Sequence, residues 1–194
     1  MYYIVIVKSF FILFLAVYIK KGSSPFFIYN GLMIYDACRL YDSPIGKIVM
    51  FSRGGLLTGL CFQETYDEDY DLSCGSSKVL EETCRWLDIY FSGTIPDFDI
   101  PIMLEGTDFQ KRVWEHVRDI PYGETVSYGD IAAMMAKERN IPRMSNQAVG
   151  TAVGKNKISI IVPCHRVINA DGRLGQYGGN EDRKLYLLQL EGHE

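Results

Sequence analysis

The chain has 194 residues, which is enough for one large or two small domains. Its formal net charge of −4 excludes a protein that is basic over its whole surface, as many nucleic-acid-binding proteins are. The five cysteines are an odd number without a Cys-x-x-Cys pair, and this indicates a reducing, cytoplasmic environment rather than a disulfide framework. We interpret Cys38, Cys61 and Cys84 as packing residues and Cys74 as a loop thiol.

Residues 1–32 form an apolar extension. The stretch from Tyr2 to Ile19 is interrupted only by Lys8 and Ser9, and its length is close to what crosses a bilayer. It does not resemble a secretory signal, because no basic region precedes it and no small-x-small cleavage site is evident. Two interpretations stay open, a membrane anchor or a mis-assigned start with translation beginning at Met33, and we favour the second. Membrane contact is expected only under the first.

Residues 33–104 predict a small domain with a meander and a helix. Turns at Ser43-Pro44 and Gly54-Gly55 separate strand-like runs at Cys38–Tyr41, Lys47–Ser52 and Leu56–Phe62. After an acidic loop over residues 64–77, apolar residues recur at helical spacing from Leu80 to Phe91, and Gly93 is the expected C-cap. Residues 95–104 alternate proline with apolar residues, so we expect an extended connection between two domains.

Residues 105–194 have a helical pattern. Thr107 or Asp108 is the expected cap of one helix, Ser127 of a second, and Ser145 or Asn146 of a third. Two short helices followed by a strand are typical of a helix-turn-helix, although two ordinary packed helices give the same pattern. The strand is expected at residues 158–162, where β-branched residues precede a proline.

The sequence Pro163-Cys164-His165-Arg166-Val167 follows that expected strand. A thiol becomes a strong nucleophile when a neighbouring base or cation promotes loss of its proton. Cys164 has an imidazole and a guanidinium directly after it, so this segment predicts a site for attack by sulfur. The alternative is an inert, buried cysteine, which is the usual state of a free thiol.

A cluster of cations surrounds the predicted nucleophile. Between residues 137 and 167 only Glu138 opposes six basic residues, which are Lys137, Arg139, Arg143, Lys155, Lys157 and Arg166. Such a patch can meet phosphates although the whole chain is acidic, and it predicts weak, salt-sensitive and largely sequence-independent binding to DNA. A solvated helix face is the alternative.

The segment around Cys164 resembles the active-site signature of the O6-alkylguanine-DNA alkyltransferases, or methylated-DNA–protein-cysteine methyltransferases. The resemblance covers roughly residues 34–192. It is carried, in family order, by Ser43-Pro-Ile-Gly-Lys47, Phe109-Gln110 with Val113-Trp114, Ile120-Pro-Tyr-Gly-Glu-Thr125, Ser127-Tyr128-Gly129, Ala148-Val149-Gly150, Asn156, Tyr177-Gly178-Gly179 and Leu190-Glu191-Gly192. It implies an α+β fold with a small ribonuclease-H-like α/β domain over 33–104. A mainly helical, winged-helix-like domain with a helix-turn-helix is implied over 105–194.

The resemblance also implies an activity. Members of the family transfer an alkyl group from O6 of guanine in DNA to a cysteine, once and irreversibly, after the damaged nucleotide has been turned out of the duplex. We therefore expect a monomer that acts on double-stranded DNA with alkylated bases, without a cofactor; O4-alkylthymine as a further substrate stays open. No histidine precedes His116, so we expect none of the zinc that some relatives hold in the amino-terminal domain.

Roles for individual residues follow from the family's motifs. Cys164 is the expected nucleophile, His165 its base through a water, and Glu191 the acid that holds the imidazole. Asn156 is expected to organise the turn that carries the nucleophile, and Tyr128 to donate to the leaving guanine. The resemblance also implies a set of contacts to DNA or to the flipped base, namely Tyr128, Gln147, Ala148, Gly150, Arg166, Val167, Tyr177, Gly178 and Gly179.

Two positions depart from the family's pattern. Gln147 stands where the best-known relatives have an arginine that fills the gap left by the extruded base, and this predicts weaker binding to DNA. Gly178 stands where a serine is common, and this predicts a roomier pocket. Three other functions stay open: an alkylguanine recognition module without catalysis, a membrane-tethered repair-derived protein, and a thiol hydrolase that turns over. Relatives of the first kind lack the cysteine that is present here.

Overall fold

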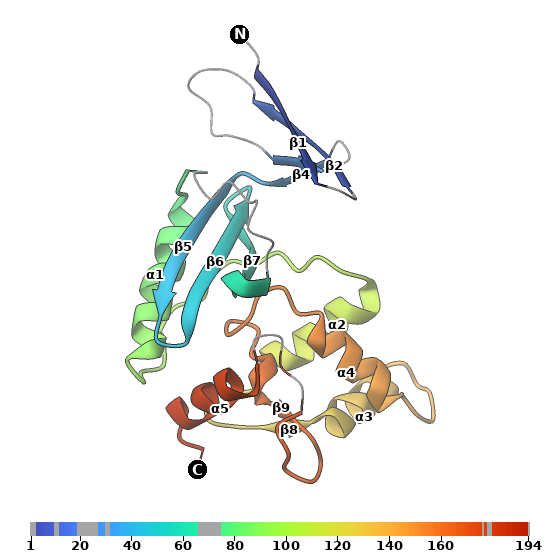
Figure 1. Ribbon diagram of the computed structural model, residues 1–194. Helices are drawn as coiled ribbons and strands as arrows, with labels where there is room; N and C mark the ends of the chain where they lie inside the picture. Colours follow the sequence, from blue (N-terminus) through green and yellow to red (C-terminus); the bar gives the residue numbers. More distant parts are fainter. Residues whose placement is uncertain are drawn as a thin grey trace.

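The computed structural model describes residues 3–9, 12–18, 27–29, 32–65, 75–175, 177 and 180–193. Figure 1 shows a small sheet with helix α1 along it, and a group of helices below that carries the C-terminus. The first strands of the chain lie at the opposite end of the molecule from the C-terminus. The predicted fold class, an α/β part followed by a mainly helical part, is confirmed.

The described part of residues 1–32 is strand. β1 (Tyr3–Ser9) pairs antiparallel with β2 (Ile12–Tyr18), and β3 (Phe27–Tyr29) pairs with β4 (Leu32–Tyr35). Among the described residues, no helix combines the length and the apolar character that crossing a membrane requires. The choice between the two interpretations of residues 1–32 stays a prediction.

The predicted meander forms a three-stranded antiparallel sheet in the order β5-β6-β7. Its strands are β5 (Ala37–Ser43), β6 (Gly46–Arg53) and β7 (Leu56–Phe62), and a short 3-10 turn, η1 (Gln63–Thr65), follows. Helix α1 (Lys78–Phe91) packs against all three strands and buries Leu80, Leu87 and Tyr90. The interpretation of Cys38 as a simple packing residue is wrong, since it is buried but takes part in a disulfide bond.

The outer edge of β7 joins the sheet to the rest of the chain. Leu57 exchanges backbone hydrogen bonds with Pro101 and Met103, and Leu60 exchanges them with Lys157 and Ser159. The register between β6 and β7 shifts here, because Leu57 pairs with Ser52 while Gly59 pairs with Phe51. Thr58 is therefore an extra residue, a β-bulge, and it allows both leucines to direct their backbone groups to the same edge. The sheet thus holds both the connection between the domains and residues 157–159.

The C-terminal part contains four helices among the described residues, and the predicted caps start three of them. Thr107 is the N-cap of α2 (Asp108–Arg118), and Ser127 is the N-cap of α3 (Tyr128–Glu138). Each forms a capping box. Ser145 is the N-cap of α4 (Asn146–Gly154), and its hydroxyl accepts from the backbone N–H of Ala148. α5 (Glu181–Leu190) follows near the C-terminus. α3 and α4 are consecutive and pack on one another; their use as a helix-turn-helix stays a prediction.

The strand predicted for residues 158–162 is wrong. Only Ile158 forms a bridge, to Leu60, and the chain then turns with Ile160 at a φ of 70°. The apolar residues Ile158, Ile160 and Val162 are buried as expected. They need no neighbouring strand, because the side chain of Asn156 donates to the carbonyls of Ile158 and Val162.

Candidate active site

Cys164 begins a short 3-10 turn, η2 (Cys164–Arg166), directly after the buried turn that replaces the expected strand. The Nδ2 of Asn156 donates to the Sγ of Cys164 at 3.1 Å, and the same nitrogen lies 2.8 Å from the carbonyl of Val162. The Oδ1 of Asn156 accepts from the backbone N–H of Ile158 at 3.0 Å. One amide side chain therefore fixes both the turn and the sulfur.

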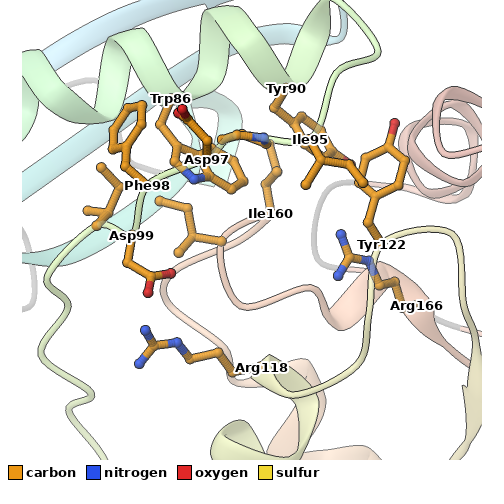
Figure 2. Close-up of a pocket in the computed structure, with 13 residues that line it drawn as sticks. Trp86, Tyr90, Ile95, Asp97, Phe98, Asp99, Arg118, Tyr122, Ile160 and Arg166 are labelled. Atoms are coloured by element: carbon orange, nitrogen blue, oxygen red, sulfur yellow. The ribbon is translucent and has the colours of Figure 1, made fainter.

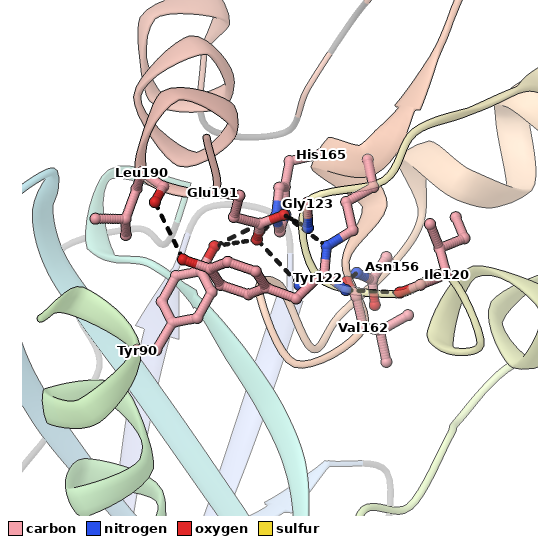
Figure 3. A network of polar contacts seen from close by, with 10 residues as sticks. Tyr90, Ile120, Tyr122, Gly123, Asn156, Val162, His165, Leu190 and Glu191 are labelled. Carbon is pink, nitrogen blue, oxygen red and sulfur yellow. Dashed lines mark hydrogen bonds and ion pairs between the residues drawn. The ribbon is translucent and has the colours of Figure 1, made fainter. Parts of the chain in front are cut away.

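His165, Arg166 and Glu191, which follow the cysteine in the chain or lie near the C-terminus, form a buried polar cluster, and Figure 3 shows the network of contacts around His165 and Glu191. Nε2 of His165 lies 2.8 Å from Oε1 of Glu191. The guanidinium of Arg166 donates from Nε to Oε2 at 2.8 Å and from a terminal nitrogen to Oε1 at 3.0 Å. Arg166 also donates to the carbonyl of Ile120 at 2.6 Å. The carboxylate is thus held by two side chains that follow the cysteine directly in the chain.

The protonation state of this cluster follows from its contacts. Burial raises the pKa of Glu191, but the hydrogen bonds from His165 and Arg166 outweigh it and lower the pKa to about 2. An ionised carboxylate only accepts hydrogen bonds, so Nε2 of His165 must be the donor. Burial lowers the pKa of His165, against the opposing effect of Glu191, and favours the neutral ring. In that ring Nδ1 carries the lone pair, and no group among the described residues lies within hydrogen-bond distance of it.

The thiol of Cys164 is protonated in this environment and needs a base. Burial raises its pKa, while the hydrogen bond from Asn156 and the positive charge of Lys184 lower it. Lys184, on α5, is fully buried and donates to the carbonyls of Val167, at 2.6 Å, and Leu174. Burial lowers the pKa of Lys184 to about 8, and the nearby thiolate opposes this effect.

Two predicted tyrosines lie near the sulfur. Burial raises the pKa of both Tyr128 and Tyr177, and the charge of Cys164 raises each further. Tyr128 begins α3, directly after β8 (Val126–Ser127), which pairs in parallel with β9 (Val167–Ile168). This pairing ties the start of α3 to the residue that follows η2. The ring of Tyr177 lies edge-on to the ring of His165, with 6.4 Å between centroids.

The expected wall of the base pocket is described in part. A cavity of about 840 Å³ is lined by Asn169, Gly172, Arg173, Leu174, Gly175, Tyr177 and Glu181. Gly175 approaches Tyr128 so closely that a Cβ there would lie 3.1 Å from the phenol oxygen. Gly178 and Gly179 lie outside the described residues. Cys164 is only 8% exposed and is not among the residues that line this cavity.

The predicted DNA-contacting residues divide into two groups. Gln147 is exposed near the start of α4, and Ala148 and Gly150 are half-buried on the same helix. Val167 is fully buried beside η2, and Arg166 is buried in its ion pair with Glu191. Arg166 therefore does not belong to the exposed basic patch, which corrects the prediction from charge.

The other five cations of that segment are exposed, namely Lys137, Arg139, Arg143, Lys155 and Lys157, and Lys157 lies 3.9 Å from a carboxylate oxygen of Glu105. The single acid of the segment, Glu138, is paired with Arg112 and His116 on α2. Among the described residues, no group of three or more histidine, cysteine or acidic side chains is arranged to hold a metal ion.

Comparisons with known proteins agree with this geometry. Residues 37–104 match the family model described as 6-O-methylguanine DNA methyltransferase, ribonuclease-like domain, and residues 108–193 match the corresponding DNA binding domain. The methylated-DNA–protein-cysteine methyltransferase of Mycobacterium leprae is 44% identical over 81% of this chain and 93% of its own length. This chain belongs to the methylated-DNA–protein-cysteine methyltransferase family.

Solved structures and a further relative of the family are also similar to this chain. The crystal structure of the Mycobacterium tuberculosis O6-methylguanine methyltransferase is 43% identical, covers 80% of this chain and 92% of its own, and has a TM-score of 0.69. A structure of the M. tuberculosis protein in complex with DNA has 44% identity, the same coverage and a TM-score of 0.67. The archaeal relative from Methanosarcina acetivorans is 39% identical over 79% of this chain and 96% of its own length.

Two residues of this family member's site were missed by the sequence reasoning. Lys184 was not singled out because a lysine in a polar helix is ordinarily exposed. Tyr90, on α1, donates to Oε1 of Glu191 at 2.6 Å and lies 3.4 Å from Nε2 of His165. Tyr90 falls at a position where an amphipathic helix is expected to bury an apolar side chain, so the pattern predicts a core residue. No pattern in the sequence distinguishes this tyrosine from the other apolar residues of the helix.

Proposed function

We propose that this protein repairs DNA by direct reversal, moving an alkyl group from O6 of a guanine to the sulfur of Cys164. The observation that carries the proposal is the hydrogen-bonded chain Asn156–Cys164 beside His165–Glu191, in a member of a family of methyltransferases. The neutral ring of His165 has its acceptor Nδ1 unpaired among the described residues, which suits it to take the thiol proton through a water.

The chemical step balances without a cofactor. The thiolate of Cys164 attacks the alkyl carbon, a carbon–sulfur bond forms, and the bond between that carbon and O6 breaks with its electron pair left on the guanine. Tyr128 donates a proton to the departing guanine and recovers one from the imidazolium of His165. The products are an unmodified guanine in DNA and an S-alkylcysteine. Because a thioether does not leave readily, each molecule acts once.

The substrate is duplex DNA, and the alkylated base is turned out of the helix before it reacts. The exposed cations around α4 support contact with phosphates, and Gly175 and Tyr177 support one wall of a base pocket. We further propose that the protein works as a monomer inside the cell, since all the residues of the proposed mechanism come from one chain. Sedimentation with and without a DNA duplex tests the monomer.

The decisive experiment follows the fate of the alkyl group. The protein is incubated with a duplex that contains one O6-methylguanine, and its peptides are then weighed by mass spectrometry. We expect one added methyl group, on the peptide with Cys164, and none in the Cys164→Ala variant. Multiple turnovers would instead indicate a hydrolase. Binding of the duplex by the intact protein without transfer would indicate a recognition module, and both results contradict the proposal.

A further inference from the structure

The catalytic cluster receives one side chain from the opposite domain. Tyr90 lies on α1, within the residues that match the ribonuclease-like domain, whereas His165 and Glu191 lie in the DNA binding domain. The hydroxyl of Tyr90 is 2.6 Å from Oε1 of Glu191 and 3.4 Å from Nε2 of His165 (Figure 3). The side chain of Tyr90 is fully buried. The domain that carries no nucleophile therefore touches the machinery around it.

A phenol has one hydrogen to give, and the geometry shows where it goes. The shorter contact is to the carboxylate, which only accepts, so Tyr90 donates to Oε1. Burial, and then the charge of Glu191, raises the pKa of Tyr90 far above its ordinary value, so it remains a donor. Oε1 thus accepts from Tyr90, His165 and Arg166 together. The three donors partly neutralise the negative charge of Glu191, and so less of that charge is left to stabilise a protonated His165.

The ring of Tyr90 is packed, and its hydroxyl adds a directional contact to the cluster. The ring of Tyr90 stacks on Trp86 at 5.4 Å and meets Tyr122 edge-on at 6.1 Å. Tyr90, Tyr122 and Arg166 also border a cavity of about 410 Å³ between the end of α1, residues 95–100 and the C-terminal domain (Figure 2). Hydrogen bonds are directional, so the donors fix the orientation of the carboxylate, which ring packing by itself does not do.

We propose that Tyr90 is a positioning residue for His165: its hydroxyl holds the shared carboxylate of Glu191, so that Nε2 of the histidine stays the donor and Nδ1 stays the acceptor for the thiol proton. The proposal rests on the proposed function only in naming His165 as the base. The charged and titratable groups that act on or contact His165 are Tyr90, Glu191, Arg166, Lys184 and Tyr177, and Cys164 precedes it in the chain. The ribonuclease-like domain thereby tunes the base of the other domain.

The test removes one oxygen. Tyr90→Phe keeps the ring and its packing but loses the third donor to Glu191, so more negative charge faces His165. We expect the pKa of His165 to rise by about half a unit to one unit, which corresponds to the net strength of a typical intramolecular hydrogen bond. The acidic limb of the pH–rate profile for alkyl transfer should move to higher pH by the same amount.

Tyr122→Phe is the matched control. It also removes one phenol oxygen, from a half-buried ring at the same junction, but that hydroxyl donates to the carbonyl of Leu190 at 3.0 Å and not to the carboxylate. The pKa of His165 is read from ¹⁵N chemical shifts in full-length Cys164→Ala protein, with His116 and His193 as internal references. The melting temperature of each variant is measured alongside.

The outcomes separate the two proposals. A higher pKa of His165 in Tyr90→Phe, with no change in Tyr122→Phe, supports the positioning role. Identical titration of His165 in both variants and the parent, even with a lower melting temperature, overturns it and leaves Tyr90 as a packing residue. The ¹⁵N titration needs no alkyl transfer, so a protein that fails to take methyl from DNA would overturn the proposed function without deciding on Tyr90.

Discussion

Replacing Glu191 by glutamine should weaken the fold as well as the reaction. The carboxylate is buried and accepts from His165, Arg166 and Tyr90, and the N–H of Gly123 lies 3.4 Å from its Oε2. An amide of the same shape has one acceptor oxygen in place of two and carries no charge. The guanidinium of Arg166 would then be buried without its counter-ion, which is the more costly half of a broken buried ion pair.

The magnitude follows from the pKa of the carboxyl group. Although burial raises it, the hydrogen bonds lower the pKa of Glu191 to about 2 from the ordinary 4.5. One pKa unit corresponds to about 1.4 kcal/mol, so the ionised carboxylate contributes roughly 3 kcal/mol to the free energy of unfolding near pH 7. Loss of one partner of a buried ion pair costs about 3–5 kcal/mol in other proteins, which agrees with this value.

The contribution should depend on pH in a defined direction. The pKa is depressed in the folded state, so the stabilisation is complete above the unfolded pKa of 4.5 and is lost as the pH falls towards about 2. At pH 4 the difference between the parent and Glu191→Gln should already be smaller than at pH 7, by roughly 1 kcal/mol.

Urea denaturation of both proteins at pH 7 and pH 4 measures these differences. Glu124→Gln is the control, because Glu124 is exposed on a loop of the same domain. A loss below about 1 kcal/mol for Glu191→Gln at pH 7, or a loss that grows on acidification, would refute the reasoning.

Three further predictions concern the reaction and the DNA. Asn156→Ala removes the donor to Cys164 and the support of the turn at Val162, so the single-turnover rate should fall roughly 10²-fold, with a normal rate counting against the assigned geometry. Lys184→Met removes the charge that lowers the thiol pKa; the rate of Cys164 alkylation by iodoacetamide should drop at pH 7 and recover at higher pH, whereas a parallel loss at every pH would indicate damage to packing. Gln147→Arg should tighten DNA binding at low salt and steepen the salt dependence by about one phosphate contact, and unchanged affinity would show that this position does not meet DNA.

Much of the fold was predictable because its signals are local. The caps at Thr107, Ser127 and Ser145 lie within three residues of the amides they satisfy, so a pattern in the sequence identifies them directly. The meander was predictable for the same reason, from alternating residues between turns. The candidate nucleophile was found because its thiol, imidazole and guanidinium are contiguous.

What was missed depends on contacts between distant residues. Tyr90 and Glu191 are 101 positions apart, and no periodicity connects them. The partner of Arg166 is 25 positions away, so its burial could not be read from its neighbours. The expected strand at residues 158–162 failed because the side chain of Asn156 satisfies backbone groups that β-branched residues usually satisfy in a sheet.

The extra residue in β7 gives the amino-terminal half an influence on where the sulfur sits. Thr58 turns the amide and carbonyl of Leu60 outward, and these groups hold Lys157 and Ser159, a few residues before Cys164. Inserting one residue between Gly59 and Leu60 would turn the amide and carbonyl of Leu60 away from this edge and leave that segment without its anchor. A chimera that joins the amino-terminal half of one relative to the carboxyl-terminal half of another therefore has to keep the positions of Leu57 and Leu60 along this strand.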